Sequence, residues 1–256
     1  MHHPVEHDDL EADLAKAAEL LRGADRVAIL TGAGISAESG LATFRGAGGL
    51  WEGHRVEDVA TPSAFKRDPQ LVWRFYNARR ANLATAHPNP GHLALVRLEE
   101  RFDGDRFTLV TQNVDGLHRA AGSRRVCEVH GSLRRVRCTG CGEVADRGTE
   151  PLDDLPHCLA CGELLRPDVV WFHEALPADV WAEAEQAASA CQCLLVIGTS
   201  AIVYPAAELV PLARFNEARV IEVNLTPTPA SQYADATLCG PSGQVLPELV
   251  KRLEGG

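Results

Sequence analysis

Four of the eight cysteines stand in a pattern that binds metal. Cys138 and Cys141 are separated by two residues, as are Cys158 and Cys161, and sixteen residues separate the two pairs. This spacing is typical of a tetrahedral four-thiolate zinc site, and its closed ligand shell would make the zinc structural. Two disulfides are the alternative, which the acidic N-terminal segment disfavours because it does not resemble a secretion signal. The other cysteines lie in apolar or strand-like surroundings and are predicted to be buried packing residues: Cys127, Cys191, Cys193 and Cys239.

A second pattern with chemical meaning is the glycine turn GAGISA at 32–37, which follows the apolar run RVAIL. G-x-G-x-x-A after a strand is typical of a dinucleotide site, because glycine lets the backbone approach a pyrophosphate closely. Alone, the pattern fits an ordinary turn equally well. Residues 39–51 continue it with many glycines, two aromatic residues and one arginine, a composition that favours a mobile lid over a ligand.

The elements that must position these residues alternate along the chain. Apolar runs predict strands at 26–30, 107–110, 193–198 and 219–224. Helical spacing predicts helices over 9–22, 69–84, 90–101, 178–190, 205–218 and 245–253. The alternation predicts an α/β fold with a doubly wound, mostly parallel sheet. Residues 46–104 and the cysteine segment do not follow it, so we expect them to form a smaller module beside the sheet.

Composition excludes several classes of protein. The 256 residues include 25 Lys and Arg against 35 Asp and Glu, which gives a net charge of −10, and 45% are hydrophobic. This is an ordinary balance for a folded chain with a sizeable core, and the acidic excess disfavours binding to a nucleic-acid backbone. No segment approaches the roughly 18–20 apolar residues of a membrane span. We therefore expect a cytoplasmic protein that binds neither membranes nor nucleic acid.

Several separated motifs, taken in order, resemble those of the sirtuins, the NAD-dependent protein-lysine deacylases. They are GAGISAESGLATFRG, TQNVDGLH, VHGSL, the two cysteine pairs, RPDVVWF, GTS and VNL, and together they span about residues 25–250. The resemblance is closest to the class III branch that contains the mitochondrial desuccinylase and many bacterial enzymes. It implies a Rossmann-like NAD-binding domain of residues 1–45, 105–135 and 165–256. Residues 46–104 and 136–164 would form the smaller module, with a helical insert and the zinc ribbon.

The resemblance also implies a reaction in which NAD is consumed. The acyl oxygen of a modified lysine attacks the ribose carbon that holds nicotinamide, and nicotinamide leaves. A base then allows a ribose hydroxyl to attack the acyl carbon, and water completes the release of lysine and O-acyl-ADP-ribose. His130 aligns with that base, and an imidazole suits the task because its usual pKa lies near neutrality. Asn113 would orient the ribose and the water, and Asp115 would hold the nicotinamide carboxamide.

The same resemblance assigns a set of NAD contacts. Phe44 would cover the nicotinamide face, Arg45 would lie near the phosphates, and Gln112 would bond the ribose hydroxyls. The GTS and VNL motifs would serve the phosphates and the adenosine end. The full set is Gly32, Ala33, Gly34, Ser36, Phe44, Arg45, Trp51, Gln112, Asn113, Val114, Asp115, Gly198, Thr199, Ser200, Asn224, Leu225, Thr226 and Ser242.

Tyr76 and Arg79 stand three residues apart on a predicted helix, hence on one face. On their own they fit a core aromatic residue beside a solvated arginine. In the desuccinylase branch, however, a Tyr-x-x-Arg pair binds the distal carboxylate of succinyl- or malonyl-lysine, and a guanidinium suits a carboxylate because it can donate two parallel hydrogen bonds. The small Ala60 also resembles that branch. We therefore predict a preference for acidic acyl groups, with weaker removal of acetyl groups.

One departure from the family pattern falls in the stretch that pairs with the substrate backbone. The family has glycine where this chain has His173, directly after Phe172. A side chain there either crowds the peptide and restricts the backbone, or points outward without effect. Both outcomes remain open from the sequence.

Other functions stay as alternatives to deacylation of acidic acyl groups. The same scaffold could act mainly as a deacetylase or as a mono-ADP-ribosyltransferase. A dehydrogenase would need a ribose-binding acid after the second strand, and none is identifiable. A zinc ribbon that binds nucleic acid through the basic cluster Arg134, Arg135 and Arg137 is a remote possibility, which the net charge disfavours.

Overall fold

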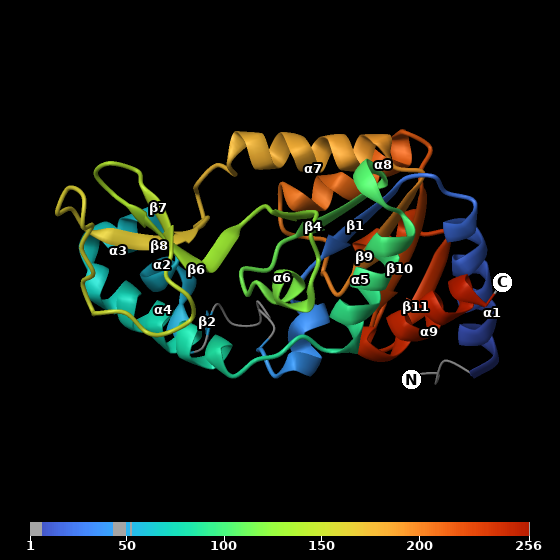
Figure 1. Ribbon diagram of the computed structural model, residues 1–256, viewed down its shortest axis with the longest axis horizontal. Helices are drawn as coiled ribbons and strands as arrows, with labels where there is room; N and C mark the ends of the chain where they lie inside the picture. The colour runs from blue at the N-terminus through green and yellow to red at the C-terminus, as the bar shows by residue number, and fades with distance from the viewer. Residues whose placement is uncertain (1–6, 43–49, 52, 256) are drawn as a thin grey trace.

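The computed structural model describes residues 7–42, 50–51 and 53–255 of the chain. Two modules lie next to each other along the longest axis of the molecule (Figure 1). The larger holds a parallel sheet with helices on both faces, and the smaller holds a short antiparallel sheet packed against helices. The predicted α/β class with a parallel sheet is therefore confirmed.

The large sheet has six parallel strands in the order β11-β10-β9-β1-β4-β5. All residues of the central strands β1 and β9 are buried, because helices cover both faces of the sheet and its middle strands must be apolar throughout. The four predicted strands are confirmed, and β5 and β11 are two further short ones. The bounds are β1 Val27–Thr31, β4 Phe107–Thr111, β5 Val126–Glu128, β9 Cys193–Ile197, β10 Arg219–Asn224 and β11 Ala236–Cys239.

Helices fill two apolar layers, one on each face of this sheet (Figure 1). Leu21, Leu95 and Leu249, from α1, α5 and α9, belong to one layer, while α7 and α8 supply the other. The helix predicted over 205–218 is shorter than expected. Residues 206–208 form the separate 3-10 turn η3, and the left-handed φ of 66° at Glu217 prevents the helix from continuing beyond Asn216. The bounds are α1 His7–Arg22, α5 Pro90–Arg101, α7 Ala178–Ala190, α8 Leu209–Phe215 and α9 Ser242–Glu254, with 3-10 turns η1 Ala33–Ser39, η2 Gly104–Arg106, η3 Ala206–Glu208 and η4 Pro229–Tyr233.

The smaller module contains an antiparallel sheet in the order β7-β6-β8. Its core combines the aromatic residues Trp73, Phe75 and Trp171 with side chains of the sheet. Pro167 lies within β8, which a proline tolerates because this strand is at the edge. The bounds are β2 Leu50–Trp51, β3 His54–Arg55, α2 Val56–Val59, α3 Pro62–Arg67, α4 Pro69–Ala84, β6 Gly131–Cys138, β7 Val144–Asp146 and β8 Leu165–Val169. Helix α6, Leu117–Ala121, contacts both modules, because Leu117 packs in the small core and His118 packs against α5 of the large domain.

The division into modules stays a proposal, and the apolar cores favour boundaries that differ from the predicted ones. Helix α5 falls in the range 46–104 predicted for the small module, yet Ala94, Leu95 and Leu98 pack in the core of the large sheet. Conversely, β6 begins inside 105–135 and β8 inside 165–256, and these two strands pair with each other in the small sheet. The apolar stripe of α5 and the pairing of β6 with β8 are tertiary features, which alternation along the chain does not reveal.

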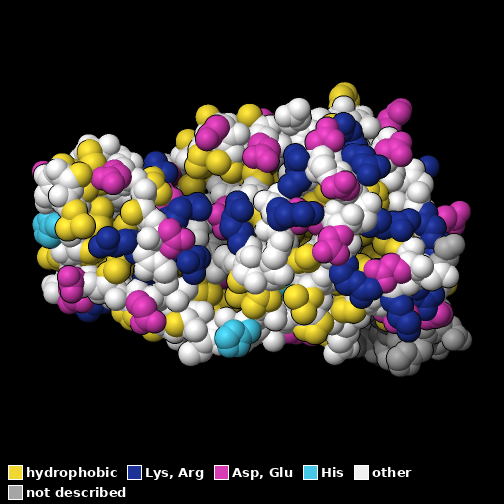
Figure 2. All heavy atoms as spheres, in the orientation of Figure 1, with side chains coloured by type: hydrophobic (Ala, Val, Ile, Leu, Met, Phe, Trp, Pro, Cys, Tyr) yellow, Lys and Arg dark blue, Asp and Glu magenta, His cyan; other side chains and the backbone are white. Residues whose placement is uncertain are grey.

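In the described part of the chain, no helix is both long and apolar enough to cross a membrane. Figure 2 shows basic and acidic side chains interspersed over the large domain on the face drawn. On that face the net negative charge does not gather into one patch.

Candidate active site

The glycine turn lies against the end of strand β9. Gly32 donates its N–H to the Ile197 carbonyl at 3.0 Å, and Gly34 donates to the Gly198 carbonyl at 2.7 Å. A Cβ on Gly34 would lie only 2.6 Å from the Gly198 Cα, so a larger residue does not fit without moving backbone. Two neighbouring strand ends are thus held in backbone contact, at the carboxyl edge where open α/β sheets bind ligands.

Polar side chains predicted from two separate motifs meet at this edge. Ser36 donates to Asp115 Oδ2 at 2.7 Å, and the Asn113 amide donates to Ser36 Oγ at 3.2 Å and to the Gly32 carbonyl at 3.1 Å. Burial raises the pKa of the Asp115 carboxyl, while bonds from Leu117 N and Ser36 partly offset that rise. The turn after β1 and the loop after β4 therefore form one hydrogen-bonded cluster.

His130 stands just beyond the end of β5, next to the same cluster. Its Nδ1 lies 3.0 Å from the Gln112 carbonyl oxygen. Since a carbonyl can only accept, Nδ1 carries the proton and Nε2 is the basic nitrogen. Burial lowers the pKa of this imidazole, so the ring is neutral at pH 7 and able to accept a proton. This geometry suits a general base.

Thr199 joins the strand ends on the other side of the glycine turn. Its hydroxyl accepts from the Gln112 side chain at 2.9 Å, and its carbonyl accepts from the Asn224 side chain at 2.8 Å. Ser242, at the start of α9, is buried, and its hydroxyl has no hydrogen-bond partner among the described residues. The structure thus brings together, along one sheet edge, residues from motifs far apart in the sequence. Of the remaining predicted contacts here, Ser200 and Leu225 are exposed, and Ala33, Val114 and Thr226 belong to the same loops.

At the other end of the site, Tyr76 and Arg79 lie on one face of α4. The Arg79 guanidinium is 5.7 Å from the centre of the Tyr76 ring, and its charge acts to lower the pKa of Asp115. Tyr76 is fully buried, and its hydroxyl accepts a 2.9 Å bond from the Trp171 indole. Burial raises the pKa of that phenol, which therefore keeps its proton and can donate it.

The turn at Phe172 and His173 is held in a defined position. Phe172 donates its N–H to the carbonyl of Ala60 at 3.0 Å, and the Glu174 carboxylate accepts two bonds from Arg166 at 2.6 and 2.8 Å. His173 has a φ of 71°, a left-handed conformation that glycine adopts without strain and other residues rarely adopt. Its side chain is exposed. The residue that replaces the family's glycine therefore retains a glycine-like backbone conformation.

Three predicted NAD contacts cannot be assigned a place. Phe44 and Arg45 lie outside the described residues, and the side chain of Trp51 does as well. The predicted lid over 39–51 is described only at its two ends.

The four predicted zinc ligands meet at one point, where their sulfur atoms all lie within 4.8 Å of one another. Neighbouring sulfurs are 3.3 and 3.8 Å apart, close to the roughly 3.8 Å between thiolates around a tetrahedral zinc and too far for disulfides. The N–H groups of Cys141 and Gly140 lower the pKa of the Cys138 thiol to about 6 and so favour the thiolate. The donor set fits a structural zinc.

Sequence reasoning missed a buried polar layer beneath the site. The rings of His92 and His118 are 4.9 Å apart, and His118 Nε2 lies 3.0 Å from the Thr31 hydroxyl. Burial lowers the pKa of His92 to about 4 and that of His118 to about 3, so both rings are neutral. The two histidines are on different helices, α5 and α6, and nothing in the sequence around either one indicates that they meet.

A second missed residue is Glu222, which is completely buried on β10. Its carboxylate accepts from the hydroxyls of Thr228 and Ser231, which also cap the turn η4. This acid fixes the loop that follows Asn224. Its strand was predicted from the apolar run RVIEVN, and the one acidic residue inside that run could have indicated a buried carboxylate with polar partners.

The arginine cluster that suggested nucleic-acid binding is engaged by carboxylates. Arg134 bonds Asp146 at 3.2 Å, and Arg137 bonds Asp168 at 2.9 Å. Arg135 bonds both Asp168 and Glu128. The cluster therefore organises the protein's own acidic groups.

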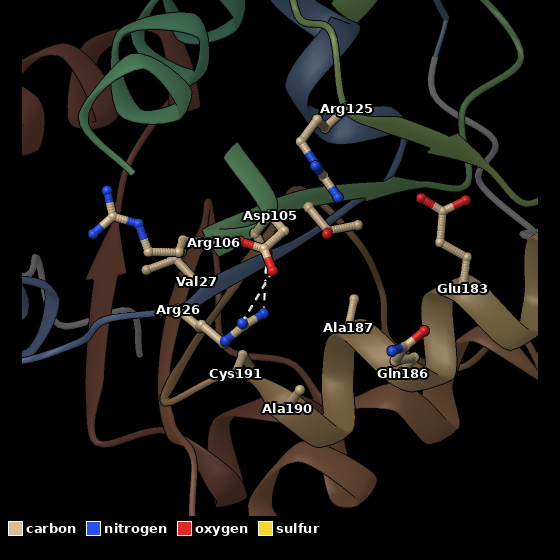
Figure 3. Close-up of a pocket in the computed structure, with 11 residues that line it drawn as sticks. Arg26, Val27, Asp105, Arg106, Arg125, Glu183, Gln186, Ala187, Ala190 and Cys191 are labelled. Atoms are coloured by element: carbon tan, nitrogen blue, oxygen red, sulfur yellow. Dashed lines mark hydrogen bonds and ion pairs between the residues drawn. The ribbon is translucent and has the colours of Figure 1, made fainter. Parts of the chain in front are cut away.

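A separate pocket lies at the opposite edge of the large sheet, where β1 and β4 begin (Figure 3). Val27 and Thr108 are among the residues that line it, and the Arg26 guanidinium pairs there with Asp105 at 3.1 Å. None of the predicted site residues lines it.

Comparisons with known proteins agree with this arrangement. The model of the Sir2 family matches residues 32–205. The chain is 49% identical to NAD-dependent protein deacylase 2 of Pyrobaculum aerophilum, over 93% of this chain and 94% of that protein. It is 41% identical to the mitochondrial NAD-dependent protein deacylase sirtuin-5 of Canis lupus familiaris, over 96% of this chain and 87% of that one.

Solved structures give the same result. A Sir2 homologue in complex with NAD superposes with a TM-score of 0.87 at 41% identity and covers 100% of this chain and 97% of that one. A Sir2 protein bound to a myristoylated histone peptide superposes with a TM-score of 0.77 at 36% identity, over 96% and 98% of the two chains.

Proposed function

The chain belongs to the Sir2 family and is an NAD-dependent protein deacylase, and we propose that it prefers acyl groups that carry a carboxylate. The single observation that carries this preference is the pairing of Tyr76 with Arg79 on one face of α4, with the Arg79 charge acting to lower the pKa of Asp115 in the cluster at the sheet edge. The proposed substrates are lysines modified with succinyl or malonyl groups, with acetyl-lysine as a weaker one.

In this reaction NAD is a co-substrate. The acyl oxygen takes the place of nicotinamide on the ribose, and water then releases lysine, so the products are nicotinamide, O-acyl-ADP-ribose and free lysine. We assign the base to His130, because its Nε2 is the basic nitrogen and its lowered pKa keeps the ring neutral at pH 7. Asn113 and Asp115 are assigned to orienting the ribose and the nicotinamide carboxamide, which their mutual bonds through Ser36 support.

The proposed preference for acidic acyl groups is supported by the hydrogen-bond donors of Arg79 and Tyr76 on α4. A guanidinium offers two parallel N–H groups to a carboxylate, and the Tyr76 hydroxyl keeps its proton for a third bond because Trp171 already donates to its oxygen. An acetyl group has no carboxylate to receive these bonds. The pair therefore favours the longer, charged acyl groups.

The preference is tested by comparing succinyl- and acetyl-peptides of one sequence. Replacing Arg79 with Met should lower the ratio of kcat/KM for succinyl over acetyl by about 10- to 100-fold, which corresponds to one lost hydrogen-bonded charge pair. Arg74→Met is the matched control, since Arg74 lies on the same helix and is exposed. Tyr76→Phe should lower the ratio less. An unchanged ratio in Arg79→Met would overturn the preference and leave the deacylase activity intact.

The assignment of the base is tested separately with His130→Ala. General-base catalysis contributes about 100- to 10,000-fold, so deacylation should fall by that amount. Formation of nicotinamide from the first step should persist, because it precedes the step that needs the base. Retention of full turnover would remove His130 from the mechanism.

We also propose a cytoplasmic location. None of the eight cysteines, all of which lie in the described part of the chain, forms a disulfide, which supports a reducing compartment. Cell fractionation that recovers the protein with an extracytoplasmic marker would contradict it.

A further inference from the structure

The connection between the two modules runs directly past His130. Strand β5 of the large sheet ends at Glu128, and β6 of the small sheet begins at Gly131. Gly131 has a φ of 80°, and a Cβ there would lie 2.1 Å from the Asp168 carbonyl oxygen. The His130 carbonyl also accepts from Val170 N at 2.9 Å. The candidate base is therefore carried on a two-residue crossing, Val129 and His130, whose position depends on both sheets.

Arg135 joins the two sides of this crossing through its guanidinium. Its Nη1 donates to Glu128 Oε2 at 2.8 Å, and its Nε donates to Asp168 Oδ2 at 2.9 Å. Glu128 belongs to the large sheet and Asp168 to β8 of the small one. The Arg135 side chain thus links β5, which leads into the crossing, to β8, which packs against the crossing.

The two carboxylates make this tie strong. Only 6% of the Glu128 side chain and 9% of the Asp168 side chain are exposed, so each needs a cationic partner to remain charged. Two further arginines flank the pair of carboxylates. Arg119 Nε lies 3.7 Å from Glu128, and Arg137 bonds Asp168. Arg135 is the member that bonds both carboxylates, and the flanking arginines reach one each.

We propose that Arg135 is a positioning residue for His130. By joining Glu128 to Asp168, it fixes the crossing and so the place of the imidazole at the sheet edge. The inference rests on the proposed role of His130 as base. A displacement of about 1 Å at a reacting group can lower a rate by about 100-fold, so a change at Arg135 acts on the step that uses the base. Release of nicotinamide, which precedes that step, depends on Arg135 much less.

The experiment measures two rates on the same purified protein with an acyl-peptide and NAD. One is turnover to free lysine, and the other is exchange of labelled nicotinamide into NAD, which reports only the first step. In Arg135→Met, turnover should fall by about 10- to 100-fold while exchange changes by less than about threefold. Arg135→Lys should recover part of the turnover, because an ammonium can still bond one carboxylate. Arg134→Met, on the neighbouring residue paired with Asp146 alone, is the control and should leave both rates unchanged.

A double substitution separates positioning from a general loss of structure. If Arg135 acts through His130, adding Arg135→Met to His130→Ala should lower turnover by less than about twofold further. Equal losses of turnover and exchange in Arg135→Met, or multiplied losses in the double variant, would overturn the proposal. If His130→Ala itself keeps full turnover, the assignment of the base fails. If His130→Ala loses turnover and Arg135→Met does not, only the positioning role fails.

Discussion

The large domain and the small module are held together by different kinds of interaction. In the large domain, two layers of aliphatic side chains enclose the parallel sheet, and the candidate site residues lie in the loops just after the strands end. In the small module, a core rich in aromatic residues is joined by polar cross-links. Trp73 donates to the Leu165 carbonyl, and Trp171 donates to Tyr76. Nearby, four thiols converge on one point.

This difference separates the two halves of the reaction. The proposed nucleotide end is fixed by backbone contacts such as that of Gly34 with Gly198, where a side chain on Gly34 does not fit. The proposed acyl end, at Tyr76 and Arg79, depends on individual side chains of the small module. Specificity for the acyl group can therefore change by substitution there, while the nucleotide chemistry stays the same.

Removal of zinc is expected to give the largest effect, confined to the small module. Structural zinc contributes roughly 10–16 kcal/mol of apparent binding free energy in small zinc domains, far more than the remaining contacts of three short strands supply. Cys141→Ser should lose bound zinc and expose β6–β8 to protease, while the parallel sheet keeps its circular dichroism signal. Zinc content and limited proteolysis measure this.

Cys239→Ser serves as the matched control, since Cys239 lies on β11 and away from the cluster. It should retain zinc and protease resistance. If Cys141→Ser kept one equivalent of zinc and the wild-type cleavage pattern, the small module would not depend on its metal.

The second effect concerns Arg80, which is 1% exposed and donates to the carbonyls of Leu133, Arg147 and Glu150. Arg80→Met keeps the aliphatic stem but leaves the buried Leu133 carbonyl and the two part-buried carbonyls of Arg147 and Glu150 without this donor. We expect a loss of about 3–5 kcal/mol in the free energy of unfolding of the small module, because three hydrogen bonds from a charged donor are lost. Urea unfolding measures it, with the exposed Arg74→Met as control. A change under about 1 kcal/mol would mean that water replaces these bonds.

Prediction from sequence succeeded where the physics is local. The helices predicted over 69–84, 90–101 and 178–190 have those bounds in the structure, because proline and capping residues mark their starts and apolar periodicity marks their length. The four longer strands of the parallel sheet were equally clear, since a buried parallel strand is a continuous apolar run. The cysteine spacing sufficed to place the metal ligands together.

Prediction failed where a residue's role depends on a distant partner. Strand β5 has three residues and β8 contains Pro167, so neither gives a strand signal of its own. The burial of His92 beside His118, and the bridge that Arg135 makes, arise from segments that meet only after folding. The left-handed φ of His173 was foreseen only as a restriction on the backbone, and the direction of its side chain was left open.

The third prediction concerns the polar layer beneath the nucleotide end. In the folded protein the pKa of His92 is about 4 and that of His118 is about 3, whereas in the unfolded chain both rings have the ordinary pKa of 6.5. Between these values the unfolded state binds more protons. Stability is therefore full above about pH 6.5 and falls with decreasing pH, by about 1.4 kcal/mol per pH unit for each ring.

Urea unfolding at a series of pH values between 7 and 4.5 measures this slope. His118→Gln should reduce the proton uptake on unfolding by about one, whereas replacing the exposed His87 with Gln should leave it unchanged. If the slope were the same in wild type and His118→Gln, the neutral histidine pair would not be the cause of acid sensitivity.

The smallest effect is expected at His173, on the acyl side. A non-glycine residue in the left-handed region costs about 1–2 kcal/mol, and glycine gives back about 0.5–1 kcal/mol through the greater entropy of its unfolded chain. His173→Gly should therefore raise the free energy of unfolding by about 0.5–1 kcal/mol, with His173→Ala as the control that keeps the strained backbone and gives no gain. Because the side chain is exposed, the substitution should change peptide turnover by less than about twofold. A clear acceleration of turnover in both variants would instead show that the imidazole crowds the substrate. The turn at His173 would then be a determinant of peptide binding.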